Sequence, residues 1–457
     1  MEWRVVVELS GAAGAVQVHE VYAGGGTMPG CSAATLGLTL ADAKAVLSGV
    51  QRHLVQAQTE EHCQARRGCS HCGGQRPLKD RRSRRLRSLF GTVEVRAPRF
   101  EPCRCSVTLR TTISPVTEIM PDRCTPEYER VLAKLGALLP YRRARALLED
   151  FFSLGDPPAI DTIQQRTLQV GARLERGSIV APASAPAAEA ETITLSIDSG
   201  HVRAVRSYQV RTFEVFVAQA SNDDGTEGGK QIAFSSVPVE ADRQTQQLRG
   251  LLHGLGATPY TEVTILSDGA DGPRSLGEAA CVGPTCHVLD WFHLAMRIQH
   301  VAQAVKGWPD IRDEDRQEGV RLADAVEHIR WRLWHGQVRR ALDLIGDTLA
   351  TVDAAAATAV KVSGVLRALE TYVAGQAMMI IDYATARHGE EPISTAPTEG
   401  TVQWLLHRRM GANQQMRWSP RGAHLMLKVR TAVTNGTFDR DHVVAERWAR
   451  RPFHRAA

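Results

Sequence analysis

Apolar and polar residues alternate over 192–197, within the segment 191–203, and this pattern predicts a β-strand. Every second residue from Ile193 to Ile197 is apolar, with threonine and serine between them. Asp198 follows where the alternation stops, and Gly200 comes two residues later. We expect a carboxylate at the end of this strand, where a glycine leaves room for a ligand. A plain turn aspartate is the alternative interpretation.

Two more strands and a helix are predicted directly after this segment. Alternation marks 207–217 and 231–234 as strands, with a polar, glycine-rich turn at 221–229 between them. Three consecutive strands joined by short turns favour antiparallel pairing. Residues 242–256 then have the apolar spacing of a helix.

A second carboxylate follows a second β-rich run. Residues 261–267 lead into Asp268, and Asp271 lies just beyond. Because this strand comes after a helix, we expect a parallel crossover that places it beside the Asp198 strand. The two strand ends then bring Asp198 and Asp268 together, and two ionised carboxylates at short range favour a divalent cation between them.

A third acidic position comes after a long helical stretch. Residues 294–393 are too long for a loop in a compact sheet and predict an inserted helical subdomain. A helix that begins near Glu399 can present this carboxylate toward the sheet and complete the cation site; a helix-terminal glutamate favoured by the macrodipole is the alternative. Asp290 and His293 lie one helical turn apart before the insertion and can face the same cleft.

Cysteines form two close pairs in the N-terminal half, after an amphipathic helix predicted over 40–58. Four thiolates in two pairs resemble a zinc ribbon. The four residues are Cys69, Cys72, Cys103 and Cys105. The second pair has a shorter spacing than usual, so Cys63 and His71 are possible substitute ligands, and free reduced cysteines without a metal are the alternative.

Charge is distributed unevenly along the chain. The net charge is only +5, but basic residues far outnumber acidic ones between 76 and 99, which predicts a polyanionic partner. A solvated basic loop is the alternative. The residues expected to contact DNA here are Arg81, Arg82, Arg84 and Arg85.

Helical patterns over 126–177 are interrupted at Asp156 and the two prolines after it. A helix, a turn and a second polar-fronted helix fit a helix-turn-helix, in which Thr162 and the neighbouring Gln164, Gln165 and Arg166 can meet DNA. An ordinary helical bundle is the alternative. Residues 178–190 are rich in Ala, Pro and Ser and predict a linker.

The composition limits the class of protein and the number of domains that the chain can form. The chain has 457 residues, of which 43% are hydrophobic and 23% charged, as in soluble proteins of two to four domains. We find no long apolar run and no leader, so we expect a cytoplasmic protein without a membrane span. Nine cysteines without an export signal favour thiols or metal ligands over disulfides.

The order of aspartate, aspartate, long helical insertion and glutamate resembles that of a DDE transposase with a ribonuclease-H-like catalytic domain. Further motifs are similar to the ISKra-type insertion-sequence transposases, related to the ISL group, over nearly the whole chain. These motifs are the two cysteine pairs, the hairpin at 90–95, Asp290-Trp-Phe-His293, Met416-Arg-Trp-Ser and Gly422-Ala.

The resemblance implies a bacterial transposase that binds terminal inverted repeats and target DNA, as a homo-oligomer in the nucleoid, and that cuts and joins strands. It gives catalytic roles to Asp198, Asp268 and Glu399, with Asp290 and His293 accessory; Asp271 or Asp290 can replace Asp268. All-oxygen ligands favour Mg²⁺, with Mn²⁺ as a substitute and a structural Zn²⁺ elsewhere. Further DNA contacts are expected from Arg408 and Arg409.

Two other functions fit the same sequence: a zinc-ribbon DNA-binding regulator without catalysis, and a ribonuclease-H-like nuclease or resolvase without strand transfer. The expected fold is multidomain α+β and α/β. It has a mixed ribonuclease-H-like sheet flanked by helices and interrupted by a large helical insertion. Zinc-ribbon-like and helix-turn-helix modules precede this part in the sequence. The expected segments are 1–60, 61–124, 125–177, the linker 178–190, the catalytic core 191–293, the insertion 294–395 and the core helices 396–457.

Overall fold

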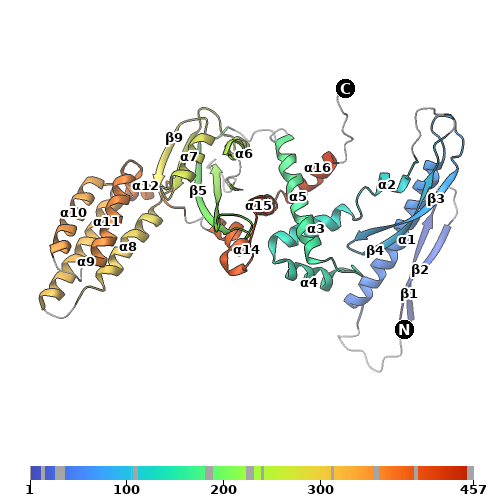
Figure 1. Ribbon diagram of the computed structural model, residues 1–457, viewed down its shortest axis with the longest axis horizontal. Helices are drawn as coiled ribbons and strands as arrows, with labels where there is room; N and C mark the ends of the chain where they lie inside the picture. The colour runs from blue at the N-terminus through green and yellow to red at the C-terminus, as the bar shows by residue number, and fades with distance from the viewer. Residues whose placement is uncertain are drawn as a thin grey trace. The chain divides into compact units, whose positions relative to one another are not determined.

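Two compact units make up the chain in a computed structural model (Figure 1). The first comprises Met1–Leu174 with Asp439–Ala457, and the second comprises Glu175–Phe438. The finer division into seven segments stays a prediction. The structure describes residues 2–11, 16–25, 36–103, 105, 112–180, 189–222, 231–237, 241–309, 313–354, 360–395 and 400–449.

The first unit begins with a hairpin and a long helix. Strands β1 (Glu2–Ser10) and β2 (Val16–Gly25) pair antiparallel. Helix α1 (Leu40–Arg67) is longer than the predicted 40–58 helix. It starts at a capping box, in which Thr39 and Asp42 satisfy each other's backbone N–H groups. Arg66 and Arg67 stand in its last turn, where the helix dipole favours positive charge.

A second hairpin carries most of the basic segment. Strands β3 (Leu78–Ser88) and β4 (Gly91–Phe100) pair antiparallel. One face of this hairpin packs its apolar residues against α1 and α2 (Pro115–Ile119). The opposite face is exposed, because side chains alternate between the two faces of a strand.

The helical part predicted over 126–177 contains three helices. They are α3 (Pro126–Leu138), α4 (Tyr141–Phe151) and α5 (Ile160–Val180). Thr125 caps α3 by accepting the Tyr128 N–H, and a proline occupies the first turn, where its missing N–H costs nothing. The C-terminal helix α16 (Phe438–Ala449) brings Asp439 to Lys134 of α3, with Nζ to Oδ2 at 3.2 Å.

The second unit is built on a five-stranded mixed sheet in the order β7-β6-β5-β8-β9. The five strands are β5 (Thr192–Arg203), β6 (Thr212–Asn222), β7 (Gln231–Ser236), β8 (Glu262–Ser267) and β9 (Thr285–Leu289). The first three pair antiparallel, whereas β8 runs parallel to β5, and β9 runs parallel to β8. The predicted antiparallel meander and the parallel crossover are therefore confirmed.

Three sequence expectations about these strands need correction. The strand predicted over 207–217 is β6, which begins at Thr212 and ends at Asn222. Asp198 lies in the middle of β5 rather than at its end, because pairing with β6 continues to Arg203 opposite Thr212. Strand β9 was not predicted; its five residues lack an apolar alternation. The end of β9 is nevertheless important, because Asp290 follows it directly.

Helices cover both faces of this sheet. Helices α6 (Ala241–Gly254) and α7 (Asp271–Ala280) pack on the face that carries the apolar side chains of β5. Residues 400–410 form a helical segment with a π-helical part at Gln403–His407. Leu406 of this segment lies against Gly200 of β5. Helix α15 (Pro420–Thr434) contacts β7, where the Thr431 and Ser235 hydroxyls are 2.5 Å apart.

The predicted helical insertion has a hydrophobic core that continues into the sheet at Leu266 of β8 and at Val288 and Leu289 of β9. Its main helices are α8 (Trp291–Val305), α9 (Asp313–Trp334), α10 (Val338–Ala354), α11 (Val360–Gly375) and α12 (Tyr383–His388). Trp291, Trp308 and Trp334 pack against this core, whereas Trp331 is 53% exposed.

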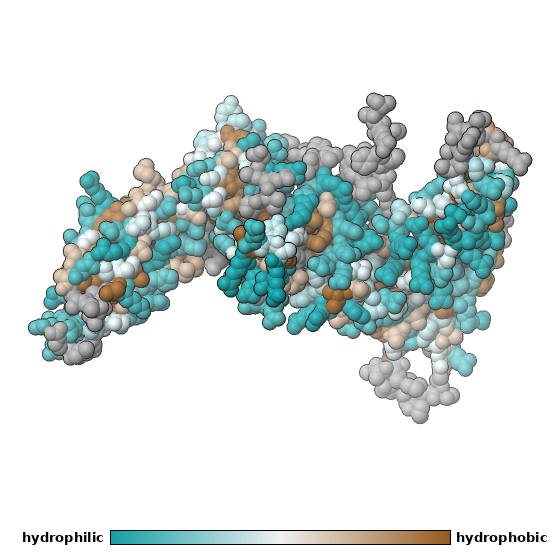
Figure 2. Space-filling model, viewed as in Figure 1, coloured by the Kyte–Doolittle hydropathy of each residue, from teal (hydrophilic) through white to brown (hydrophobic). Residues whose placement is uncertain are grey.

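The visible face of the molecule is mainly hydrophilic (Figure 2). None of the helices in the described ranges combines the length and apolar character needed to cross a bilayer.

Candidate functional site

Three aspartates occupy one row across three neighbouring strands. Ser196 of β5 is in register with Leu266 of β8, which is in register with Val288 of β9. Two residues further along each strand stand Asp198, Asp268 and Asp290. The backbone supports this alignment, since the Asp290 N–H donates to Ser267 O at 2.8 Å. Parallel strands thus bring together carboxylates that are far apart in the sequence.

Asp198 stands at one end of this aspartate row, because β5 pairs with β8, and β8 pairs with β9. Burial raises the pKa of its carboxyl, and the charges of Asp268 and Asp290 raise it further. The Ser199 N–H, which donates to Asp198 Oδ1 at 2.7 Å, and the nearby His293 act on this pKa in the opposite direction. The four side chains therefore share one electrostatic environment, in which negative charge is in excess.

Asp268 is held by a tight turn at the end of β8. Its Oδ1 accepts the Ala270 N–H at 2.9 Å. Gly269 has φ +84° and a side chain there would lie 2.8 Å from Gln376, so glycine is required on both counts. The Gln376 amide donates to Gly269 O at 3.0 Å, and the Tyr372 hydroxyl donates to Asp268 O at 2.7 Å. The helical insertion thus fixes the backbone that carries Asp268.

Asp290 is fully buried and already engaged by protein groups. It caps α8, and its Oδ1 accepts the Phe292 N–H at 2.8 Å. Its Oδ2 accepts the Thr395 hydroxyl and lies 3.7 Å from His293 Nε2. Asp290 therefore supports the row more readily than it binds a ligand.

Asp271 has a different environment from the aspartate row. Its side chain is 88% exposed and forms an ion pair with Arg274 at 2.8 Å. The geometry accordingly favours Asp268 over Asp271 as the partner of Asp198.

Glu399 lies outside the described residues, but the helical segment that follows it is described. The Thr401 hydroxyl donates to Gln219 Oε1 at 2.8 Å, and Gln219 pairs with Ser196 of β5. A Cβ on Gly200 would approach Leu406 Cδ2 to 2.3 Å, so this segment contacts β5 directly. Gly200 and Asp198 are two residues apart on one strand and face the same side of the sheet.

A buried arginine stabilises the π-helical part of this segment. Arg430 of α15 donates from Nε to Leu405 O at 2.7 Å and also bonds Trp404 O. Burial lowers its pKa to about 10, so it stays charged at neutral pH. These bonds satisfy carbonyls within the π-helical part. Short π-helical segments are frequent at functional sites.

The expected DNA contact by Arg409 is wrong for this structure. Its side chain is 0% exposed and packs 5.3 Å from the Trp418 ring centroid, so it offers no surface to DNA. Arg408, by contrast, is exposed beside the Trp404 ring.

The aspartate row fits a divalent cation only in part. Asp198 and Asp268 each use Oδ1 for a backbone N–H, and neither Oδ2 has a hydrogen-bond donor among the described residues. The carboxylates do not form a set of three ligand atoms within 4.8 Å in the described part of the chain. Two carboxylates are thus available, and a complete site needs a ligand from another segment.

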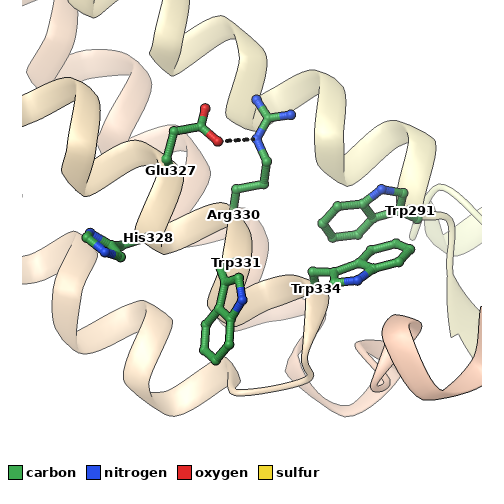
Figure 3. A pocket seen from close by; sticks show the side chains of 6 residues that line it. All are labelled: Trp291, Glu327, His328, Arg330, Trp331 and Trp334. Atoms are coloured by element: carbon green, nitrogen blue, oxygen red, sulfur yellow. Dashed lines mark ion pairs between the residues drawn. The ribbon is translucent and has the colours of Figure 1, made fainter.

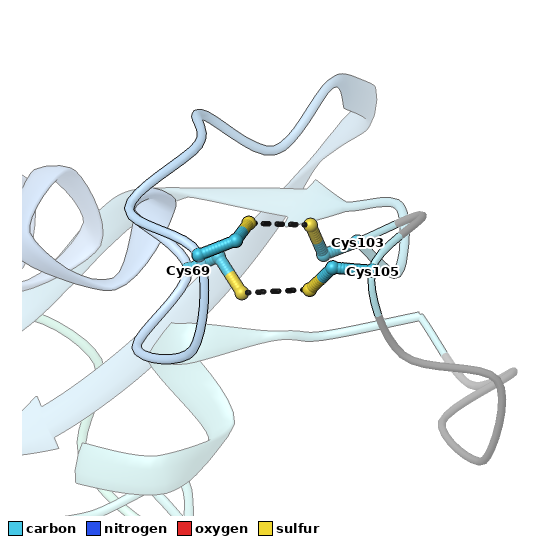
Figure 4. Close-up of side chains that lie close together, drawn as sticks. Cys69, Cys103 and Cys105 are labelled. Atoms are coloured by element: carbon cyan, nitrogen blue, oxygen red, sulfur yellow. Dashed lines mark hydrogen bonds between the residues drawn. The ribbon is translucent and has the colours of Figure 1, made fainter.

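Four cysteines do form such a group in the first unit. The side-chain sulfurs of Cys69, Cys72, Cys103 and Cys105 lie within 4.8 Å of one another. The Cys69–Cys105 and Cys72–Cys103 sulfur pairs are 3.6 and 3.4 Å apart (Figure 4). Four thiolates at about 2.3 Å from a tetrahedral zinc ion stand about 3.8 Å from one another. This four-cysteine site can therefore bind a metal such as zinc.

The local backbone prepares these thiols for a cation. The N–H groups of Cys72 and His71 lower the pKa of Cys69 to about 6. The pKa of Cys103 is also lowered, chiefly by the Cys105 N–H, whereas Cys105, which shares protons with its three neighbours, has a pKa of about 12. Zinc displaces such shared protons when it binds.

The two substitute ligands proposed from the sequence are not part of this site. Cys63 lies in the apolar core beneath the β3–β4 hairpin, and burial raises its pKa. His71 is exposed. Cys105, with its short spacing from Cys103, takes the fourth position.

The basic residues of the first unit differ in whether their side chains are accessible to a polyanion. Arg81, Arg82 and Arg85 are exposed on β3. Arg84 instead donates to Met120 O, to Pro121 O at 3.2 Å and to the Thr117 hydroxyl at 3.3 Å. Exposed side chains on β3 therefore remain accessible to a polyanion at Arg81, Arg82 and Arg85.

In the predicted helix-turn-helix, Gln165 is exposed and Gln164 is half-buried. Arg166 is engaged with Glu129 at 3.1 Å and Asp122 at 3.5 Å, contacts that hold α5 against its neighbours.

A pocket of about 580 Å³ lies elsewhere in the second unit, within the helical insertion (Figure 3). Its lining residues are Trp291, Glu327, His328, Arg330, Trp331 and Trp334. None of the aspartates of the row lines it, so this pocket is separate from the carboxylate site.

No family model matches the chain, and no curated protein matches its sequence. One solved structure, the Drosophila P element transposase strand transfer complex, is similar over 69% of this chain and 93% of that chain, with 12% identity and a TM-score of 0.33. Likeness at this level transfers neither residue roles nor an activity to the present chain.

Proposed function

We propose that this chain is a DDE-type transposase with a ribonuclease-H-like catalytic part, which binds DNA ends and catalyses strand cleavage and transfer with Mg²⁺. The observation that carries the proposal is the row of Asp198, Asp268 and Asp290 on three neighbouring strands. A mixed sheet flanked by helices and interrupted by a helical insertion agrees with the fold that this function implies.

In this proposal Asp198 and Asp268 supply carboxylate oxygens to the cation, and Glu399 supplies the third carboxylate. Support for Glu399 comes from chain continuity, because Thr401 is bonded to Gln219, which neighbours β5. Two residues of chain span at most about 7 Å. Asp290 and His293 contribute charge and hydrogen bonds around the cation site, and they do not contact the reacting groups.

The chemistry needs a cation for a physical reason. Divalent cations make a water or a 3′-hydroxyl more acidic and stabilise the charge that develops on the leaving oxygen. The chain's contribution is to hold partly buried, mutually repelling carboxylates on a rigid sheet, so that a cation is bound in a defined place. The raised pKa of Asp198, caused first by burial and then by its acidic neighbours, reflects this arrangement.

DNA binding is assigned mainly to the first unit. The exposed Arg81, Arg82 and Arg85 on the β3–β4 hairpin supply phosphate contacts, which makes binding dependent on salt. The four-cysteine site, with zinc bound, ties the end of α1 to the end of β4 and so fixes the base of this hairpin.

The test is an assay of strand cleavage and joining. The full-length protein is incubated with Mg²⁺ and a duplex that carries the terminal repeats of the DNA element encoding the chain. End-specific nicking and joining that are lost in Glu399→Gln support a transposase. Cleavage without joining indicates a nuclease or resolvase, and binding without any cleavage indicates a regulator.

A further inference from the structure

A cationic side chain stands beside the aspartate row on helix α8. The helix begins at Asp290, and His293 and Arg297 follow at a spacing of four residues, which places them on one face. His293 is near Asp290, and Arg297 is exposed to solvent. The first turns of α8 therefore carry His293 next to Asp290 and, one turn further on, the exposed Arg297.

Arg297 is held in place by an aromatic ring. Its guanidinium carbon lies 3.8 Å from the centroid of the Tyr372 ring, a cation–π contact between α8 and α11. The hydroxyl of the same tyrosine donates to Asp268 O at 2.7 Å. Only one aromatic ring therefore separates the guanidinium from the backbone of a proposed catalytic residue.

The Tyr372 hydroxyl is a stable donor in this position. Burial raises its pKa to about 12, and the positive charge of Arg297 acts in the opposite direction. The hydroxyl thus keeps its proton at neutral pH, and its bond to Asp268 O persists.

The contact with the ring leaves most of the guanidinium donors available. A guanidinium has five N–H donors, and one aromatic side chain does not use them all. Within the described part of the chain, no carboxylate lies within ion-pair distance of Arg297, whereas Arg274 of α7 and Arg330 of α9 are both paired. An ordered, exposed cation beside a carboxylate row is complementary to an anion that lies over that row.

We infer that Arg297 binds a backbone phosphate of the DNA strand that enters the aspartate row, and that Tyr372 is a positioning residue for both Arg297 and Asp268. This inference rests on the proposed function. The ring of Tyr372 immobilises the guanidinium, and its hydroxyl fixes the turn of Asp268. One side chain thereby sets the distance between the phosphate-binding group and the carboxylates.

The first test measures DNA binding against salt concentration, without added Mg²⁺, by fluorescence anisotropy. Loss of one phosphate contact lowers the slope of log K against log salt by about 0.9. We expect this loss for Arg297→Ala, and for Tyr372→Leu, which removes the ring. Tyr372→Phe keeps the ring and should keep the slope. Arg339→Ala removes a matched exposed charge from α10 and should leave the slope unchanged.

The second test separates the positioning role from general stability. Tyr372→Phe loses the bond to Asp268 O, so the Mg²⁺ concentration for half-maximal cleavage should rise several-fold, while the rate at saturating Mg²⁺ changes little. Arg297→Ala should not move the Mg²⁺ requirement. Thermal unfolding of each variant serves as the control for folding.

Three results would overturn the inference. One is an unchanged salt slope in Arg297→Ala, and another is an equal loss in Arg339→Ala, which would indicate a general charge effect. The third is an unaltered Mg²⁺ requirement in Tyr372→Phe. If the wild-type protein cuts DNA while these variants behave in that way, only this inference fails; if the wild type neither binds nor cuts DNA, the proposed function fails with it.

Discussion

Asp198 lies on β5 and Asp268 directly follows the adjacent parallel strand β8, each two residues beyond the paired residues Ser196 and Leu266. Burial raises the pKa of Asp198, and the charge of Asp268 adds to this effect. A buried carboxylate beside a second one lowers the stability of the fold unless a cation compensates the charge. Each prediction below concerns a consequence of this arrangement or of the four-cysteine site.

Asp198→Asn should stabilise the metal-free protein at pH 8. A carboxyl with a raised folded-state pKa stabilises the fold below its unfolded pKa, and this contribution is lost as the pH rises through the folded pKa. At pH 8 the ionised Asp198 is therefore unfavourable, and its replacement should add roughly 1 kcal/mol, the usual scale of a single stabilising change. The gain should shrink on acidification. Thermal unfolding at several pH values measures it.

The matched control for this experiment is Asp271→Asn, because Asp271 is exposed and outside the row. Mg²⁺ should raise the melting temperature of the wild type and of this control, but much less that of Asp198→Asn. A destabilised Asp198→Asn protein at pH 8 would show that Asp198 contributes to the fold in its ionised form and would argue against a strained site.

Asp290→Asn should keep most of the cleavage activity and shift its pH dependence. Both oxygens of Asp290 are engaged by protein groups, and an amide preserves the acceptor for the Phe292 N–H. Removing its charge lowers the pKa of Asp198, so the acidic midpoint of cleavage should move to lower pH. A pH–rate profile checks this. Complete loss of cleavage at every pH would instead identify Asp290 as a ligand.

Zinc should be present at one ion per chain and should depend on the four-cysteine site. Cys69→Ser removes a thiol of low pKa and should abolish zinc retention, which elemental analysis measures directly. Cys63→Ser is the matched control, since Cys63 lies in the apolar core and should leave the zinc content unchanged. Zinc removal should cost several kcal/mol of stability in the first unit. Zinc retained by Cys69→Ser would contradict this assignment.

Arginines of the β3–β4 hairpin should fall into two classes, those that bind DNA and those that stabilise the fold. Arg85 is exposed, so Arg85→Ala should weaken DNA binding and lower the salt slope by about 0.9, without changing stability. Arg84 donates to the carbonyls of Met120 and Pro121, so Arg84→Ala should lower the melting temperature by several degrees. Anisotropy and thermal unfolding separate the two effects. Equal behaviour of both variants would argue against a DNA-binding face on this hairpin.

Much of the sheet is predictable from the sequence, because several of its strands have a recognisable pattern of apolar and polar residues. Alternation marks β5, and a helix before β8 requires a parallel crossover, which together bring Asp198 and Asp268 to neighbouring strands. The length of β5 is not predictable in this way. Its apolar alternation ends at Ile197, but hydrogen bonding to β6 extends it to Arg203.

Other features depend on contacts that a sequence pattern does not encode. Strand β9 is short and polar at its start, and only its pairing with β8 defines it. The sequence therefore predicts that Asp290 faces the same cleft, but not that it stands in a row with Asp198 and Asp268. The burial of Arg409 follows a π-helical part at Gln403–His407, which changes the helical phase relative to an ordinary α-helix. The link from Tyr372 to Asp268 O spans 104 positions and leaves no local signal.

The most direct test of the account compares Asp268→Asn with Asp271→Asn in Mg²⁺-dependent cleavage of DNA by the full-length protein. The two aspartates are three positions apart, but only Asp268 belongs to the row. We predict that Asp268→Asn abolishes cleavage while DNA binding is retained, and that Asp271→Asn cuts at the wild-type rate. Normal cleavage by Asp268→Asn, or its loss in Asp271→Asn alone, would contradict a metal site built on the aspartate row.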